Sequence, residues 1–391
     1  MALRTLGDAA AAQEAFTIAT RLCQQANNPI RTLLAYSHLG ATQTWQGQLH
    51  EAATSFQRAL HYAEVAGTPD MPATGMAFTW LGRVLYEWGD LVSAEATIRR
   101  GLARGAHWWS RDIQMAGIAA LARVLAARHD LAGLITLYDD AQLLALRYNL
   151  HWPAAVVAMF IAQLYADQGD LSAALAQVNA IRSDRLSTSD GFGRVAEIQS
   201  TLHIRLLLAQ HNHQQALIAI AAAPGQVVGG GSRTCRIELQ MLSVQAYLQA
   251  ARPQLAYQAF ETALVLAEPA GYIQVFLNDY EAVYDLLIQA RRQHRPNSPI
   301  RIHVERLLRM CPHEVTAAIE ELTPALIEPL REREREILLL LAAGHSTRAI
   351  AQQLVISAGT VKWHLQNIYT KLQVRSRTQA IARAHELRIL T

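Results

Sequence analysis

A pattern of small and large apolar residues recurs every 40 or 42 residues between Ala12 and Ala223. In each copy a turn precedes the first position of the pattern, which is a small residue in five of the six copies. A large apolar residue follows four positions later, and another small or apolar residue three positions after that. Spacings of four and three place these residues on one face of a helix. The small residues allow close helix contact, and the large residue fills the space between helix pairs. The six copies begin at Ala12, Ala52, Ala94, Leu134, Ala174 and Ala216.

A second helix is expected before each of these faces. The combined pattern predicts helix–turn–helix pairs stacked into a superhelix, and its near-constant register favours this over an ordinary helical bundle. The unit from Leu39 to Ala59 resembles the tetratricopeptide family, although the period exceeds that family's period of about 34 residues. An all-α fold is therefore expected. Twelve residues before the later copies lie Gly40, Gly82, Ala122, Ala162 and Ile204.

The first copy is incomplete, because counting back twelve residues from Ala12 leaves the sequence. Residues 1–6 supply only the last turn of a first helix. A repeat stack normally begins with a capping unit that has a polar outer face. We therefore expect the chain to be the C-terminal part of a longer protein.

Beyond the sixth copy the pattern is less regular. The glycine-rich residues 224–232 predict a break in the stack. Residues 236–251 and 253–267 predict one more helix pair. The expected organisation is a tetratricopeptide-like helical-repeat domain over 1–290, a helical linker over 291–326 and a small domain over 327–391.

Positive charge is concentrated in this last domain. The chain has a net charge of +3 with His neutral. Residues 327–391 contain ten Arg or Lys and five Glu, a balance of +5, which leaves −2 for the rest of the chain. A basic balance confined to one small domain is expected of a nucleic-acid-binding domain.

Four short helices are predicted in the last domain. The second and third, 348–354 and 358–372, are joined by a three-residue turn, which is typical of a helix-turn-helix motif. In the third helix, spacings of four, three and four residues predict a buried stripe of Val361, Leu365, Ile368 and Leu372. The first and fourth helices are expected at 331–343 and 377–387.

The whole segment resembles the LuxR-type DNA-binding domain. The matching stretches are 328–338, Gly344, 350–351, 357–372 and 374–380. The resemblance implies a third helix in the major groove of double-stranded DNA. It places Lys362, Trp363 and Gln366 against base edges, and Thr360, His364 and Lys371 on or near the phosphate backbone.

Several of these positions have plainer interpretations. Lys362 is otherwise a solvated lysine, and Trp363 otherwise packs against a neighbour. Arg375 and Arg377 are expected either to bind phosphate or to be solvated. His364 is not expected to bind a metal, because no second ligand lies at helical spacing.

A tetratricopeptide-like array followed by a LuxR-type domain resembles the large ATP-dependent transcription regulators of the maltose-activator type. The resemblance implies that the array senses a small-molecule or protein effector and that the chain binds promoter DNA as a dimer. The ATPase module of that family is expected to be absent here. The rival hypothesis is a helical-repeat scaffold with weak or vestigial DNA binding.

Enzyme functions find little support in the sequence. A phosphate-binding P-loop needs a Lys after Gly, but the only two lysines, Lys362 and Lys371, follow Val and Thr. His50-Glu51 and His313-Glu314 lack the second His of a zinc protease. We therefore expect no catalytic residue, no metal and no cofactor.

Trp80, Trp108, Trp109 and Trp152 fall on or near first helices of repeats. They are expected either to form an effector pocket or to belong to the core. The three cysteines lie far apart, which fits a reducing cytoplasmic compartment. The most apolar stretch, 152–166, is too short to span a membrane, so no membrane association is expected.

Overall fold

The computed structural model describes most of the chain. Every regular element among the described residues is a helix, as the repeat pattern predicts. The chain divides into two compact units, Met1–Met310 and Cys311–Thr391. The described residues are 8–105, 111–148, 151–181, 194–226, 231–311, 332–343, 345–354 and 377–386, with the single positions 361, 364, 365, 368 and 374.

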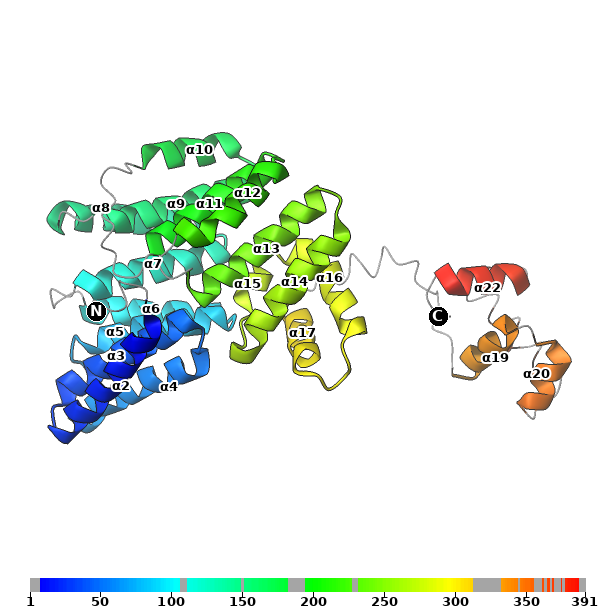
Figure 1. Cartoon of the computed structure of the whole chain (residues 1–391), viewed down its shortest axis with the longest axis horizontal. Helices are drawn as coiled ribbons and strands as arrows, with labels where there is room; N and C mark the ends of the chain where they lie inside the picture. Colours follow the sequence, from blue (N-terminus) through cyan, green and yellow to red (C-terminus); the bar gives the residue numbers. More distant parts are fainter. Residues whose placement is uncertain are drawn as a thin grey trace. The chain divides into compact units, whose positions relative to one another are not determined.

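The first unit is a stack of antiparallel helix pairs (Figure 1). Each first helix contacts the first helix of the next pair, and each second helix packs on its own partner. This arrangement is the tetratricopeptide-like superhelix that the sequence predicts. After α2 (Ala9–Gln25), the pairs are α3 (Pro29–Gln46) with α4 (Leu49–Val65), α5 (Thr74–Glu87) with α6 (Leu91–Gly105), α7 (Arg111–Ala127) with α8 (Leu131–Tyr148), α9 (Trp152–Asp167) with α10 (Leu171–Ala180), α11 (Arg194–Ala209) with α12 (His213–Gln226), and α13 (Arg233–Gln249) with α14 (Pro253–Ala267).

The repeated small residues lie where the helices touch. The first position of all six predicted copies is buried, with at most 2% of its surface exposed. A seventh copy, which the sequence analysis missed, follows 40 residues after the sixth. It consists of Ala256, Phe260 and Ala263, all fully buried on α14. The same four-and-three spacing therefore continues to the end of the stack.

The turns inside the pairs repeat one backbone geometry. Five residues before the first position, the chain takes a left-handed conformation, with φ of +83° at Gly47 and +81° at Gly89. The next residue is often an Asp that caps the second helix, as when Asp90 Oδ1 accepts from the backbone N–H of Ser93 at 3.0 Å. In the sixth copy the left-handed residue is His211, which keeps the same register without a glycine.

The first unit continues past the repeats. It adds the 3₁₀ helix η3 (Glu268–Ala270), α15 (Gln274–Leu277), α16 (Tyr280–Gln293) and α17 (Pro299–Met310). Val304 and Leu307 of α17 are fully buried, and α17 contacts α15 and α16. Residues 291–310, expected in a linker, thus pack as part of the first unit, because α17 has an apolar face that needs a partner.

The second unit has its own small core. Its described helices are α19 (Glu332–Ala342), α20 (Thr347–Gln353) and α22 (Arg377–Glu386). Three positions of the predicted stripe, Val361, Leu365 and Ile368, are buried here as expected, and Leu372 lies outside the described residues. The other buried members are Ile337, Leu338, Leu341, Ile350, Ala351, Ala380 and Ala384.

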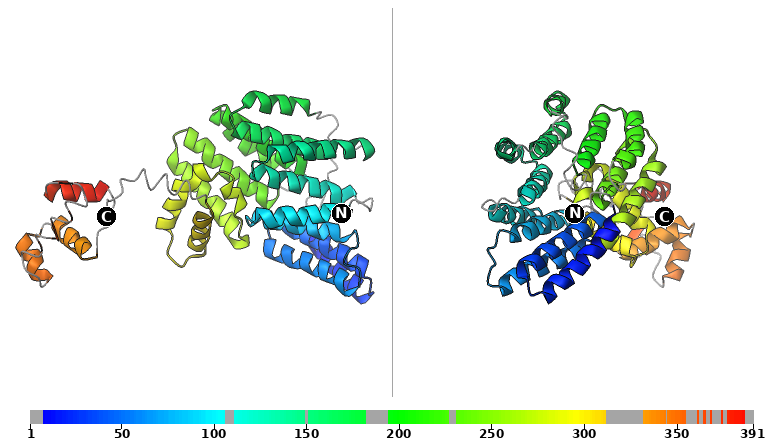
Figure 2. Two further views of the ribbon diagram at one scale, coloured as in Figure 1. Left: turned by 180° about the vertical axis from the view of Figure 1, so that it is seen from behind. Right: turned by 60° about the vertical axis from the view of Figure 1, so that its left-hand side comes forward.

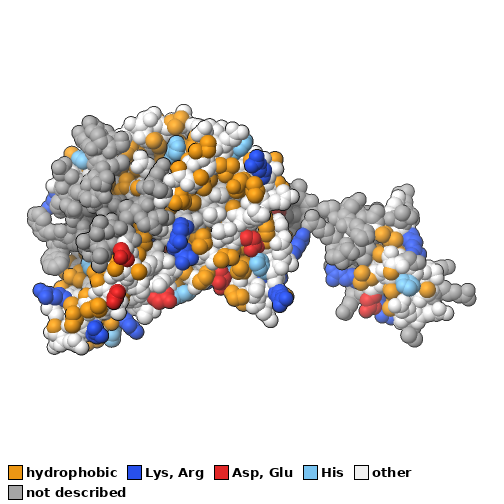
Figure 3. All heavy atoms as spheres, in the orientation of Figure 1, with side chains coloured by type: hydrophobic (Ala, Val, Ile, Leu, Met, Phe, Trp, Pro, Cys, Tyr) orange, Lys and Arg blue, Asp and Glu red, His pale blue; other side chains and the backbone are white. Residues whose placement is uncertain are grey.

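Within the described part of the chain, no helix combines the length and the apolar character needed to cross a membrane. On the face of the first unit drawn in Figure 3, basic and acidic side chains are interspersed with apolar ones.

Candidate DNA-binding and effector sites

From α5 to α13, each first helix directs one polar side chain toward the interior of the superhelix. It occupies the position directly after the small or apolar residue of the repeat pattern on that helix, and successive members lie 40 or 42 residues apart. Each of them lines at least one cavity or cleft of the first unit. We call this set the inner ladder, which comprises Arg83, Arg123, Gln163, Arg205 and Gln245. The sequence analysis missed it, although it follows from the repeat register.

The arginines of the inner ladder are held by carboxylates. The Nε of Arg83 donates to Glu87 Oε1 at 3.0 Å, within α5. Arg123 on α7 pairs with Glu238 on α13 at 2.5 Å. Both side chains are largely buried, at 12% and 14% exposed. Burial is the largest single influence and disfavours the charged form of Arg123, but Glu238 together with Tyr86 and Glu87 outweighs it, and the pKa of Arg123 is raised.

Arg205 on α11 makes the most specific of these pairs. Its two terminal nitrogens donate to the two carboxylate oxygens of Asp279, at 3.0 and 3.2 Å. This two-point geometry is directional as well as charged. Burial is again the largest single influence and disfavours the guanidinium charge, but the carboxylates of Asp279, Asp167 and Glu238 together more than compensate, so the pKa of Arg205 is raised. Both arginines are therefore fixed cations in the wall of the interior.

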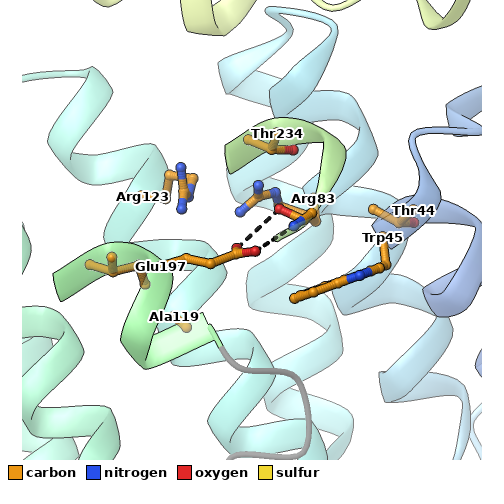
Figure 4. A pocket seen from close by; sticks show the side chains of 9 residues that line it. Thr44, Trp45, Arg83, Ala119, Arg123, Glu197 and Thr234 are labelled. Carbon is orange, nitrogen blue, oxygen red and sulfur yellow. Dashed lines mark hydrogen bonds between the residues drawn. The ribbon is translucent and has the colours of Figure 1, made fainter. Parts of the chain in front are cut away.

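A first small chamber lies among five of the first helices (Figure 4). Trp45, Arg83 and Arg123 point into it from α3, α5 and α7. Glu197 on α11 crosses to α13, where it accepts from the backbone N–H and the hydroxyl of Ser232, at 2.5 and 3.0 Å. The chamber measures only about 20 Å³. Polar cross-contacts thus fill most of this region.

A second chamber and an outer cleft lie further along the ladder. The chamber measures about 70 Å³ and the cleft about 460 Å³. They share His129, Asp167, Arg205, Asn278 and Tyr280 in their walls. The two spaces therefore adjoin at this wall, and the cleft is the wider of them.

Of the four tryptophans predicted to form an effector pocket or to belong to the core, two are described by the structure. Trp80 and Trp152 are buried in the core, at 2% and 7% exposed. Trp108 and Trp109 lie outside the described residues. Trp45, which lies seven residues before the first position of its copy, does line a cavity.

The predicted DNA-binding residues lie mostly outside the described part of the chain. These are Lys362, Trp363 and Gln366, expected at base edges, and Thr360, Lys371 and Arg375, expected at the backbone. His364 is described and half-buried. Their roles stay predictions.

Arg377, expected at DNA phosphate or in solvent, has a partner within its own unit. Its guanidinium donates to the backbone carbonyl of Leu341 at 2.8 Å, in the last turn of α19. The guanidinium of Arg333 donates in the same way to the backbone carbonyl of Leu354, the residue that follows α20, at 2.7 Å. Arginines that satisfy open carbonyls at helix ends stabilise those ends. The two arginines thus join α19, α20 and α22.

Two family models match the chain. The model described as a MalT-like TPR region matches residues 1–293. The model described as bacterial regulatory proteins of the luxR family matches residues 328–384.

Among curated proteins, the chain is similar to HTH-type transcriptional regulators MalT. The protein from Serratia proteamaculans (strain 568) is 24% identical over 377 residues, and the one from Yersinia pestis (strain Pestoides F) is 23% identical over 364 residues. Each alignment covers 88% of this chain and 39% of the relative, so the chain spans about two fifths of the length of these relatives. Because the first model covers well over half of the sequence, the chain belongs to the family of MalT-like TPR regions, and its last segment is a domain of the luxR family of bacterial regulatory proteins.

Proposed function

We propose that the chain regulates transcription by binding promoter DNA through its second unit, in response to an effector sensed by its first unit. The observation that carries the proposal is the core of the second unit. There α19, α20 and α22 pack with Val361, Leu365 and Ile368, in a segment that matches the luxR family. The relatives are HTH-type transcriptional regulators.

The buried stripe indicates how DNA would be read. A helix whose positions 361, 365 and 368 face the core directs positions 362, 363 and 366 away from it, since each residue turns by about 100°. Lys362, Trp363 and Gln366 are then available to base edges in the major groove. The charge balance of +5 over residues 327–391 supports attraction to the phosphate backbone. One such domain reads a half-site, so two copies would bind a full operator.

The outer cleft is the proposed effector site. Its volume of about 460 Å³ falls within the range of roughly 300–1,000 Å³ that is typical of small-molecule sites. Its wall combines the fixed cation Arg205 with Asp167, two imidazoles and the ring of Tyr280. Polar groups that converge from several elements can orient a small polar molecule.

Binding to DNA upstream of the gene and its neighbours, measured across a salt titration, tests the DNA-binding role. We expect affinity to fall steeply with salt concentration, because Lys and Arg displace counterions from DNA. We expect Lys362→Ala with Gln366→Ala to lose the sequence preference, since each lost base contact costs about 1–3 kcal/mol. Arg58→Ala on the exposed face of α4 removes one charge elsewhere and is the matched control.

Three results would count against the proposal in different ways. No binding at low salt would exclude the isolated chain as a DNA-binding protein and favour the scaffold. Binding that ignores sequence would restrict the second unit to backbone contact. An effect of Arg58→Ala equal to that of the double variant would show that bulk charge, not the third helix, determines binding.

A further inference from the structure

The end of the repeat stack folds back against its beginning. Residues 268–279, here called the closing segment, include η3 and α15 and contact the end of α5. The backbone N–H of Ile273 donates to the carbonyl of Glu87 at 2.7 Å, and the indole N–H of Trp88 donates to the carbonyl of Ala270 at 3.0 Å. These bonds join residues more than 180 positions apart. They close the superhelix into a ring, whose arrangement can be followed in Figure 2.

Further contacts bring α13 to the same place. The hydroxyl of Thr234 donates to the buried carboxylate of Glu87 at 3.0 Å, and α13 also contacts α3. Glu87 therefore binds two returning elements, through its carbonyl and through its side chain. The close approach needs a left-handed glycine at Gly89, where a Cβ would lie only 3.0 Å from a methyl group of Ile273.

The closing segment is anchored on its own side by apolar contacts. The ring of Phe276 packs edge-on against Phe260 of α14, with centroids 6.0 Å apart, and against His303 of α17 at 6.1 Å. On its other side, three hydrogen bonds connect the segment to residues 86–88 at the end of α5. Hydrogen bonds contribute little net stability compared with apolar packing. The contact with α5 also buries Ile273, which lies against Gly89, but it is the side of the segment that depends on hydrogen bonds between distant parts of the chain.

The same segment forms part of the effector cleft. Asn278 and Asp279 lie in the wall of the outer cleft, and the amide of Asn278 donates to the hydroxyl of Tyr86 at 3.2 Å. Asp279 also holds Arg205 of the inner ladder. A molecule in the cleft therefore contacts the residues that close the ring.

We propose that the closing segment is a latch, and that its release from the end of α5 is the conformational change by which the first unit responds to its effector. The role of this release in responding to an effector rests on the proposed function. Whether residues 268–279 separate from residues 86–88 does not, because it depends only on contacts within the chain. The segment leads directly into α16 and α17, which precede the second unit in the sequence.

Hydrogen exchange of the full chain, followed by mass spectrometry, tests the latch. Trp88→Phe with Thr234→Val removes two donors across the closure while keeping similar side-chain volumes. We expect amides in peptides 268–279 and 84–90 to exchange at least tenfold faster, and amides of α7 and α9 to keep their wild-type rates. Trp152→Phe with Thr32→Val makes the same chemical changes away from the closure, and it should leave the two peptides unchanged.

A second variant keeps the test independent of those two side chains. Arg205→Met with Asp279→Leu removes the ion pair without leaving a lone buried charge. It should accelerate exchange in the same two peptides. Unchanged exchange in both variants, or a uniform rise over the whole first unit, would overturn the latch.

Affinity for the promoter fragment then tests the response. If the closing segment is a latch for sensing, the Trp88→Phe/Thr234→Val variant should bind the fragment with an affinity at least threefold different from wild type. Local opening without any change in affinity would overturn the signalling role. A wild-type chain that binds no DNA would contradict the proposed function, while the exchange data would still decide the release.

Discussion

His303 on α17 is a buried imidazole whose charge state differs between the folded and unfolded chain. Only 5% of its surface is exposed, and its ring packs against Phe276. Burial is the main cause that lowers its pKa to about 4, and the nearby Arg306 adds to the effect. An unfolded His takes a proton near pH 6.5. The unfolded chain therefore binds more protons between these values, and the free energy of unfolding falls as pH drops from 6.5 toward 4.

This linkage predicts a loss of about 1.4 kcal/mol per pH unit inside that window. Urea unfolding at pH 7.5 and pH 5.0, followed by tryptophan fluorescence, measures it. His303→Gln should lose part of the pH dependence, because it removes the titrating group. His61→Gln changes an exposed histidine of α4 and should retain the wild-type dependence. Equal pH dependence in His303→Gln and wild type would contradict the assignment.

The helices approach each other most closely at glycines of the repeat. A Cβ at Gly82 of α5 would lie 2.9 Å from the backbone oxygen of Ala94 and 3.1 Å from the backbone nitrogen of Ile98, both on α6. Backbone atoms of a packed helix cannot move aside singly. At Gly117 of α7 the nearest atoms, at 2.4 Å, belong to the flexible side chain of Leu102. Replacing each glycine by alanine changes helix propensity by the same amount, but only at Gly82 does the new Cβ meet backbone atoms. Comparing the two variants therefore isolates the effect of close backbone contact.

We predict that Gly82→Ala lowers the free energy of unfolding by more than 1 kcal/mol. Alanine gains about 1 kcal/mol of helix propensity at either site, but the clash between α5 and α6 outweighs it at Gly82. Gly117→Ala should be neutral within about 1 kcal/mol, since Leu102 can change rotamer. Thermal unfolding of the two variants checks this. A Gly82→Ala variant as stable as Gly117→Ala would show that the pair spacing adjusts freely.

The sequence predicted the helix pairs because each pair repeats one packing requirement at a constant interval. It predicted the core of the second unit from one stripe, since Val361, Leu365 and Ile368 have helical spacing. The inner ladder recurs at the same interval, but its residues are polar. In the sequence, a polar residue that faces the inside of a superhelix cannot be distinguished from one on the outer surface, because the curvature of the stack is not known. Contacts such as Arg205 with Asp279 depend on that curvature, so no local pattern encodes them.

The whole molecule has separate cores in its two units. The core of the second unit is small, and every buried residue in it comes from positions after residue 330. A small core gives a small free energy of unfolding, so a single cavity can remove most of it. Leu338 and Leu339 are neighbours on α19 with opposite surroundings, since Leu338 is fully buried and Leu339 is 53% exposed.

Leu338→Ala should therefore unfold or loosen the second unit alone. Truncating a buried leucine costs about 2–5 kcal/mol, which is comparable to the total stability expected of so small a unit. Hydrogen exchange should accelerate in α19, α20 and α22, and DNA binding should be lost, while α7 and α9 keep their protection. Leu339→Ala should leave both readouts near wild type. If Leu338→Ala also weakened protection in α7 and α9, the two units would not unfold independently. The separate cores would then fail to account for the stability of each unit.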